Sequence, residues 1–459
     1  MKTFFKLTLS ILISCTGCKK FVDPGIPSSQ LVTGAVFQSD QSANAAITGL
    51  YASLIPNTTG SFLNYQITLF TGLMADELIA PAANNQEFYQ NNLNPEVSSA
   101  SALWENGYEQ IYRANAILKG LSGAEKLSPD LKKQLEGEAR FMRALCHFYL
   151  LNLYGDIPYI TTTDYTINNQ VSRLPVKQVY ELILQDLNQS ATLLPDAYTS
   201  DERIRPNKST ALALTARLYL YTGSWANAEK TAGQLINRKD LYQLSNTLNP
   251  IFLKNSTETI WQLKSSIANF NTVEGSWFIL KAAPTSSYLS PDFVKSFEKG
   301  DLRKTAWVDS LIIGNSKWYY PAKYKVKSGS AVTENMIFFR LSEQYLIRAE
   351  ACARQEKLPQ AIADIDVIRQ RAGLALIKDT DPSISAADLL MIIENERKEE
   401  FFAEMGHRWF DLKRTGRATA ILSGLKAPNW QKEDQLMPIP KSQIDRDPNT
   451  IQNPGYSSN

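Results

Sequence analysis

Apolar residues recur at helical spacing over most of the chain. The clearest case runs from Glu138 to Leu151, which is apolar on nearly all sides after its first turn and stops near Gly155 and Pro158. Spacing of this kind, followed by a glycine and a proline, predicts an α-helix. An apolar surface all round predicts that other helices surround it. We therefore predict a mainly α protein with this helix in its interior.

Two later segments, at 211–229 and 345–365, repeat one helical hairpin design. In each, a small residue on the first helix is followed twelve positions later by one on the second, and the pairs are Ala216 with Ala228 and Ala349 with Ala361. This is the spacing of the small contact positions in a tetratricopeptide hairpin. Because the two units are not in tandem, we predict a tetratricopeptide-like scaffold with long loop excursions rather than a regular solenoid.

Helical periodicity is interrupted in two long excursions. The first, at about 78–101, is rich in Asn, Ala and Ser, and the second, at about 246–333, contains Pro, Gly, Ser and aromatic residues. Within the second, residues 260–263 are predicted to form a short strand. Long loops on a rigid scaffold are where binding residues concentrate. We therefore look for function in these two excursions.

The first residues carry positive charge followed by a short apolar run at 7–13, which is typical of a secretory signal and too short to span a bilayer. Cys15 and Cys18 follow, each after a small residue that suits a lipoprotein signal peptidase. We favour Cys18 as the lipidated residue, because cleavage before Cys15 leaves a very short leader. The prediction is a signal peptide at 1–17 and one binding domain at 18–459, and an ordinary cleaved signal is the alternative.

The mature chain is electrically balanced. Cleavage before Cys18 removes Lys2 and Lys6 from the 48 basic residues, so 46 remain against 46 acidic residues. No basic field for nucleic acid is therefore expected. The remaining cysteines, Cys146 and Cys352, lie in apolar helical patterns, and we interpret them as buried thiols.

Several motifs, in order along the chain, resemble those of the SusD/RagB family over nearly the whole mature sequence. The strongest is Glu396–Phe401 leading into Gly406–Arg414. The others are Cys18–Phe21, Trp104–Tyr108, Ile111–Asn115, Glu138–Ala144, Leu153–Pro158, Arg340–Leu341, Leu346–Glu350, Ile368–Gly373, Pro438–Pro440 and Gln452–Tyr456. Each motif alone is weak, whereas the ordered set is specific.

The resemblance implies an α-rich, lipid-anchored protein on the outer face of a Bacteroidetes-like outer membrane. It also implies capture of oligosaccharides, or in some relatives peptides, and a partnership with a SusC-like TonB-dependent transporter. The family has no catalytic residues to carry over. Its ligand contacts lie on variable loops, so they are not transferable residue by residue.

Catalysis is not expected from the charged motif. Adjacent residues on a helix, such as Glu399 and Glu400, point about 100° apart and do not flank one bond, as catalytic carboxylates must. The only histidines, His147 and His407, lack metal-ligand spacing, and we interpret His147 as a hydrogen-bonded core residue. We predict no metal, no cofactor and no enzymatic activity.

The charged motif is predicted instead to serve packing. One helical stripe is expected to carry Phe401, Met405, Trp409 and Leu412, while neighbouring helices pair with Arg397, Glu400, Arg408 and Asp411. Trp104 and Trp261 are assigned to the core as well, because they lie on periodic elements. Trp307 and the Trp318–Tyr320 run are left open.

Sugar capture without chemistry needs flat apolar faces for pyranose rings and polar groups for their hydroxyls. The two excursions supply both kinds of side chain. The predicted ligand contacts are Asp76, Asn84, Asn85, Phe88, Tyr89, Trp277, Phe278 and Tyr288, with Asn91 and Asn92 as further amides. Asp76 would bond ligand hydroxyls rather than act as an acid. Each aromatic could instead serve packing.

The leading hypothesis is a surface protein that binds an oligosaccharide and delivers it to a transporter. Peptide capture is an alternative of the same class. A tetratricopeptide adaptor that binds only protein, and a hydrolase with an unrecognised site, are alternatives from other classes.

Overall fold

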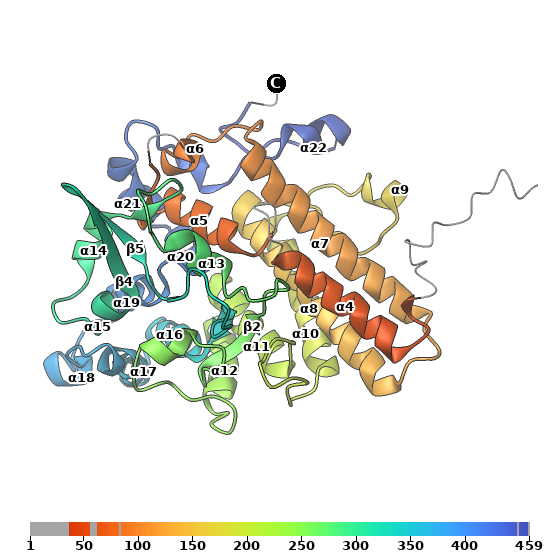
Figure 1. The fold of residues 1–459 in the computed structure, drawn as a ribbon, viewed down its shortest axis with the longest axis horizontal. Coiled ribbons are helices and arrows are strands. Elements are labelled where there is room, and N and C mark those ends of the chain that lie inside the picture. The colour runs from red at the N-terminus through yellow and green to blue at the C-terminus, as the bar shows by residue number, and fades with distance from the viewer. Residues whose placement is uncertain (1–35, 56–61, 82–83, 448, 458–459) are drawn as a thin grey trace, which may run out of the picture.

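The computed structural model describes residues 36–55, 62–81, 84–447 and 449–457, and the predicted leader with Cys15 and Cys18 lies outside them. This part of the chain is mainly helical (Figure 1). The helices of the scaffold are α4 (Asp40–Leu54), α5 (Tyr65–Met74), α7 (Ser98–Ser122), α8 (Pro129–Tyr154), α10 (Val176–Leu193), α11 (Lys208–Tyr221), α12 (Trp225–Ile236), α16 (Leu341–Ala353), α17 (Leu358–Arg371), α19 (Ala386–Phe401), α20 (His407–Arg414) and α21 (Ala418–Leu425).

Shorter elements lie mostly in the connections. The short helices are α6 (Gln86–Tyr89), α9 (Tyr165–Asn168), η1 (Asn249–Phe252), α13 (Val273–Phe278), α14 (Pro291–Ser296), α15 (Leu302–Trp307), α18 (Ile377–Thr380), η2 (Lys432–Gln435) and α22 (Lys441–Arg446). The strands are β1 (Leu78–Ile79), β2 (Thr259–Leu263), β3 (Tyr288–Leu289), β4 (Val308–Ile313), β5 (Ser316–Pro321) and β6 (Met336–Arg340).

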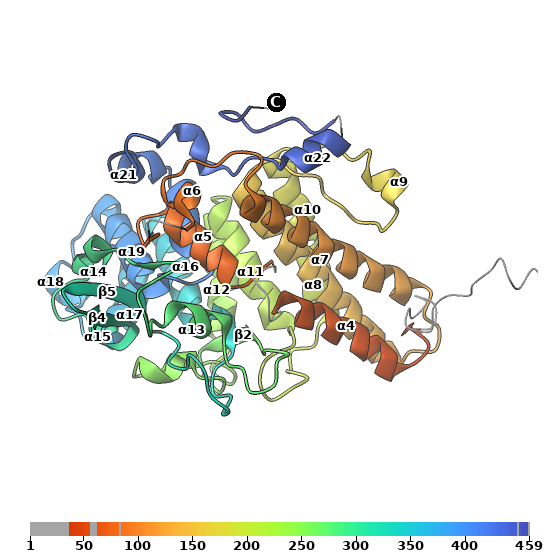
Figure 2. The ribbon, with the colours of Figure 1, turned by 45° about the horizontal axis from the view of Figure 1, so that its top comes forward.

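The predicted buried helix is the second half of α8. Pro129 stands at its first turn, where no backbone N–H is needed, and Gly155 ends it with a positive φ of 75°. α7 and α10 pack along its sides (Figure 2). The C-terminal segment closes over its end, where the Met437 N–H donates to Leu153 O at 2.8 Å.

The two predicted hairpins are α11–α12 and α16–α17, and all four small contact residues are fully buried: Ala216, Ala228, Ala349 and Ala361. The hairpins also stack on each other, because α12 packs against α16. Ile347 and Ala351 of α16 share one apolar cluster with α11 and α12. The scaffold is therefore continuous in space although the second excursion separates its halves in sequence.

Strands of the second excursion take part in two small sheets, and β6 follows just after the excursion. The sheet with β4 and β5 lies at the end of the molecule away from α7 and α8 (Figure 1), whereas β2 lies near the centre, where its Trp261 contacts Phe141 of α8 at 5.1 Å. β2 pairs antiparallel with β6, which confirms the strand predicted at 260–263. The other sheet has the order β1-β3-β5-β4 and is antiparallel throughout. Its outer strand β1 comes from the first excursion, so the two excursions are joined by backbone pairing.

The charged motif is not one helical stripe, and this part of the prediction is wrong. α19 ends at Phe401 and α20 begins at His407, with a turn between them. Ala403, Met405 and Gly406 have φ values of 49°, 43° and 78° in that turn, which no α-helix accommodates. The predicted burial is confirmed all the same, for Phe401, Met405, Trp409 and Leu412.

The charged residues of the motif pair with other elements, as predicted. Glu400 is fully buried and contacts Arg303, Arg340 and Arg371. Burial alone would raise the pKa of Glu400, but these three guanidinium groups outweigh it and hold the pKa far below its usual range. Further pairs join Arg397 to Asp411 at 2.8 Å and Arg408 to Asp76 at 2.8 Å.

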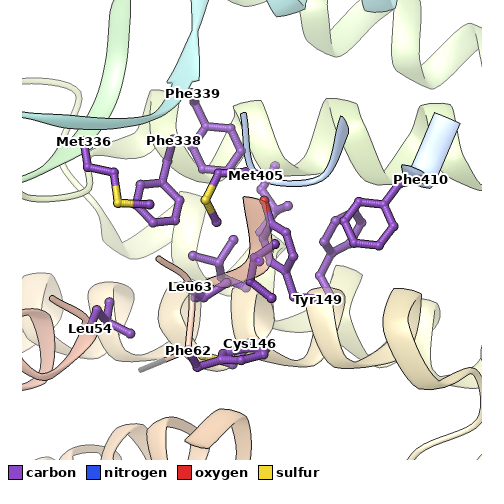
Figure 3. Close-up of a cluster of buried hydrophobic side chains, with 14 of the residues drawn as sticks. Leu54, Phe62, Leu63, Cys146, Tyr149, Met336, Phe338, Phe339, Met405 and Phe410 are labelled. Carbon is purple, nitrogen blue, oxygen red and sulfur yellow. The ribbon is translucent and has the colours of Figure 1, made fainter. Parts of the chain in front are cut away.

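The apolar interior confirms the assignments of Trp104, Trp261 and Trp409, and it also contains Trp307. In Figure 3, the Met405 side chain lies between Phe338 and Phe339 on one side and Leu63 and Tyr149 on the other. These residues come from segments far apart in the sequence. Cys146 and Cys352 are both buried free thiols.

His147 is a core residue, and both nitrogens of its ring form hydrogen bonds. Its Nε2 accepts from the Ile160 N–H at 3.2 Å, which leaves the proton on Nδ1 to donate to Arg143 O at 2.9 Å. Burial lowers the pKa of His147 to about 3, so the ring is neutral. One nitrogen binds α8 and the other binds Ile160, so the ring connects the segment after α8 to that helix.

Candidate binding surface

The two excursions meet, and amide side chains of the first bind the second. The Asn84 Nδ2 donates to Thr285 O at 2.9 Å, and the Asn85 Nδ2 donates to Ser286 O at 3.4 Å. Asn85 adopts a left-handed conformation with φ 57°, which asparagine tolerates better than most residues. These two predicted contacts therefore lie beside Tyr288, which follows Ser286 by two positions on β3.

Trp277 is the most exposed tryptophan of the two excursions. It lies on α13, and 43% of its surface is exposed. One face of its indole stacks on the Tyr65 ring, with centroids 5.4 Å apart and planes inclined by 20°. The Tyr65 hydroxyl in turn shares a hydrogen bond of 2.6 Å with Ser286 Oγ. Trp277 is thus packed against Tyr65 on one face, and much of the rest of its side chain is exposed.

Nothing in the sequence distinguishes Tyr65 as a site residue, because it lies within the apolar α5 and its pattern is typical of a core residue. It is indeed buried, and its ring edge also contacts Phe278 at 5.1 Å. Its role at the surface is indirect, because it fixes the plane of Trp277. The only available signal was its position just before the first excursion.

Aromatic side chains also cover one face of the four-stranded sheet. Tyr288 packs with Trp318 and Leu311 against a small apolar cluster that contains Tyr320. Trp318 and Tyr288 are partly exposed. The Tyr320 hydroxyl donates to Asp309 Oδ2 at 2.8 Å. Trp318, which sequence left open, therefore joins Tyr288 at the same surface.

Four predicted contacts are placed differently from the expectation. Phe88 is fully buried and stacks on Phe70 at 4.0 Å, and Phe278 is buried against Tyr65. Burial corrects the expectation that these two phenylalanines touch a ligand. Tyr89 is partly exposed, but the Lys426 ammonium covers its ring at 4.1 Å. Asn91 is buried as well.

Asp76 is committed to the protein, which corrects the expectation that it bonds ligand hydroxyls. Both of its oxygens accept from Arg408, at 2.8 Å each. Burial would raise the pKa of Asp76, but the bonds and charge of Arg408 lower it overall. The neighbouring Glu77 is buried and accepts from the Ala403 N–H at 3.5 Å, within the turn between α19 and α20.

The Lys327 ammonium lies beside Trp277, where it donates to Ser276 O at 2.5 Å and to Ile279 O at 2.8 Å. Burial raises the pKa of Glu274, on the same helix as Trp277, to about 7, and burial together with the Asp76 charge raises that of Glu77 to about 8. Near neutral pH the Glu77 carboxyl is therefore mostly protonated, and the Glu274 carboxyl is protonated in about half of the molecules. The open atoms are instead the indole face and the Oδ1 oxygens of Asn84 and Asn85, which have no partner among the described residues. Such a surface suits stacking and hydrogen bonding.

The described residues contain no group of three or more His, Cys, Asp or Glu side chains arranged to hold a metal ion. They also contain no helix that is long and apolar enough to cross a membrane.

Comparison with known proteins places the chain in a family. A family model described as "Starch-binding associating with outer membrane" matches residues 21–220, and one described as "SusD family" matches residues 289–456. The SusD-like protein P2 of Formosa agariphila is 27% identical, covering 98% of this chain and 99% of the relative. The starch-binding protein SusD of Bacteroides thetaiotaomicron is 24% identical, covering 84% of each.

The fold is similar to that of solved members. A laminarin binding SusD-like protein superposes with a TM-score of 0.77 at 22% identity, covering 91% of this chain and 100% of that one. The two family models follow each other along the chain, and the SusD-like protein P2 matches it nearly end to end. This chain therefore belongs to the SusD/RagB family, a family of glycan-binding proteins that associate with the outer membrane.

Proposed function

We propose that this protein captures an oligosaccharide on the Trp277 surface and passes it, chemically unchanged, to a SusC-like TonB-dependent transporter. The observation that carries the proposal is the indole of Trp277, backed by Tyr65 and open to solvent where the two excursions meet. A pyranose ring offers an apolar face to such an indole and hydroxyls to the nearby amides. The family to which the chain belongs supports a glycan as the ligand.

Binding without turnover is the activity that these side chains support. Glycoside hydrolysis needs two carboxyl groups placed on either side of the scissile bond. Three carboxyl groups near Trp277 are unsuited to this role, since Arg408 holds Asp76 and both Glu77 and Glu274 are buried. The protein would therefore hold its ligand and release it intact.

The anchor belongs to the same proposal and is testable on its own. We propose lipidation at Cys18, because several acyl chains on one cysteine hold a protein firmly on a membrane. Cys18→Ala should release the protein from the membrane fraction and abolish metabolic labelling with fatty acid, while Cys15→Ala should change neither. Labelling lost only with Cys15 would move the anchor, and labelling unaffected by either change would remove it.

The central experiment is a screen on glycan and peptide arrays, followed by calorimetry and product analysis on each hit. We expect an oligosaccharide to bind with micromolar to millimolar strength and to remain unchanged. Trp277→Ala should weaken binding by about 1 kcal/mol or more. Trp225→Ala is the matched control, because Trp225 is also partly exposed but lies on α12, where Arg354 covers its ring.

Each other outcome favours a different function. A peptide hit would favour RagB-like peptide capture, and turnover of a hit would favour a hydrolase. A blank screen combined with firm binding to the transporter would favour the protein-only adaptor. Oligosaccharide binding that survives Trp277→Ala would leave the function standing and reject the proposed surface.

A further inference from the structure

A second aromatic pocket is lined by residues of α7, α9 and α22. These helices lie on the side of the molecule away from the β4–β5 hairpin (Figures 1 and 2). Its volume is about 290 Å³, near the lower end of the range of ligand sites, about 300–1,000 Å³. It shares no lining residue with the Trp277 surface. The side chains on which the argument depends are Trp104, Tyr112, Tyr165, Asn168, Asn169 and Gln443.

Two of its aromatic residues are unusually exposed. Tyr112 on α7 is 53% exposed and Tyr165 on α9 is 73% exposed. The base of the pocket is firm, because Trp104 is buried and packs against Tyr108 at 4.9 Å, and the Tyr108 hydroxyl donates to Pro158 O at 2.9 Å. Exposed large aromatics beside a rigid base are an arrangement that packing alone does not require.

Amide groups with unused hydrogen-bonding atoms face the same pocket. The Asn168 Nδ2 donates to Thr162 O at 3.0 Å, but its buried Oδ1 has no partner among the described residues. The side chains of Asn169 and Gln443 make no hydrogen bond within the described part of the chain either. A buried carbonyl oxygen without a donor is costly, so this site is completed by a ligand or solvent that donates to it.

The pocket is close to neutral. Its lining contains no lysine or arginine, and its one carboxylate, Asp447, is occupied locally. The Asp447 oxygens accept from the Asn449 N–H at 2.9 Å and from the Thr450 hydroxyl at 2.7 Å. An anionic ligand therefore finds no counter-ion in this lining. An uncharged molecule with an apolar face and several hydroxyls matches both the tyrosines and the amides.

We infer that this pocket is a second sugar-binding site, which takes a short segment of a neutral glycan between Tyr112 and Tyr165. The inference rests on the proposed function, since it assumes that glycans are the ligands of this protein. The two sites would bind separate parts of one chain or separate chains. Two weak sites on one body raise the apparent affinity for a long glycan well above that of either site.

The test uses saturation-transfer NMR on the whole mature protein with a stated panel of probes: glucose, galactose, mannose, xylose and their α- and β-linked dimers. Three variants are compared with the wild type: Trp277→Ala, the double variant Tyr112→Ala/Tyr165→Ala, and Met391→Ala as an exposed control on α19. The tyrosines are exposed, so the double variant should fold, and circular dichroism checks this. At least one probe should keep its signal in Trp277→Ala and lose about fivefold or more in the double variant.

The outcomes separate this inference from the proposed function. Signals that depend only on Trp277 would overturn the second site and leave the proposed function intact. Signals that survive both the single and the double variant would overturn both assignments of site. The absence of signal for every probe in the wild type would overturn the second site and the glycan-binding function together.

Discussion

The motif at Glu396–Arg414 and the Trp277 surface differ in what their side chains contact. In the motif, Glu400 and Trp409 are enclosed by partners from several distant elements. At the surface, Trp277 rests on one ring and otherwise meets solvent. The motif therefore serves to hold the scaffold together, whereas the Trp277 surface is available to bind a ligand.

This difference explains why the family could be recognised while the ligand could not. Residues of the strongest motif, such as Glu400 and Trp409, are enclosed by neighbours within the fold. The proposed contacts are restricted by one or two neighbours at most. Substitutions in the motif should consequently change stability with little direct effect on ligand contacts, and substitutions at the surface should do the reverse.

The largest effect is expected from Glu400→Gln. It removes the charge that compensates three buried arginines, and breaking a buried ion pair typically costs about 3–5 kcal/mol of unfolding free energy. Urea unfolding measures it. The control is Glu109→Gln, whose pair with Arg113 is exposed and should be worth less than about 1 kcal/mol. Equal effects for the two variants would contradict the structural role of the network.

Trp409→Ala should come next, at about 3–5 kcal/mol, because it empties a large core position on α20. Its indole packs edge-on against Trp430 at 6.3 Å. The same unfolding assay applies. A loss below about 0.5 kcal/mol, as for a surface residue, would undo the assignment of the motif to packing.

Glu77 should give a smaller effect that depends on pH. The pKa of Glu77 is about 8 in the folded protein, above its ordinary value of 4.5. The protonated carboxyl therefore contributes its full amount to the free energy of unfolding below about pH 4.5, and this contribution is lost as pH rises through about 8. Glu77→Gln keeps a neutral side chain. The difference in unfolding free energy, variant minus wild type, should grow by about 1–3 kcal/mol from pH 5 to pH 8. A difference that stays constant would reject the buried, protonated state.

The smallest stability effect should come from the other region. Trp277→Ala removes a half-exposed side chain and should change the unfolding free energy by less than about 1 kcal/mol, while weakening oligosaccharide binding by a similar or larger amount. Unfolding and calorimetry on one preparation compare the two. A loss of stability as large as that of Trp409→Ala would show that Trp277 belongs to the core. It would contradict the proposed difference between the two regions.

Much of the scaffold was predictable because helical spacing carries its own signal. The alanine pairs of both hairpins follow from it, and so does the buried half of α8. The stacking of α12 on α16 was not predictable, since spacing within a helix does not reveal which distant helix it meets. The break at 402–406 was missed because Ala403 and Met405 are ordinary helix formers whose left-handed conformations depend on tertiary contacts.

The site was predictable only in part. Composition identified the two excursions, and they do meet, yet it did not separate exposed from buried aromatics. Trp277 and Phe278 are neighbours in sequence and both contact Tyr65, yet Trp277 is 43% exposed and Phe278 is buried. The pairing of Asp76 with Arg408 joins residues more than three hundred positions apart. Local sequence contains no information about a partner at that distance.

The pairing of β2 with β6 has a consequence for how the glycan specificity of such a protein can change. Leu263 lies opposite Met336, so the segment between them leaves the scaffold and returns to it at one point. For a segment closed in this way, doubling the length adds only about 0.6 kcal/mol of closure entropy. Insertions in the exposed loops of this segment should therefore be tolerated. Replacing residues 264–335 by the corresponding segment of a relative should transfer glycan preference when the buried Arg303 and Trp307, which lie within it, are kept.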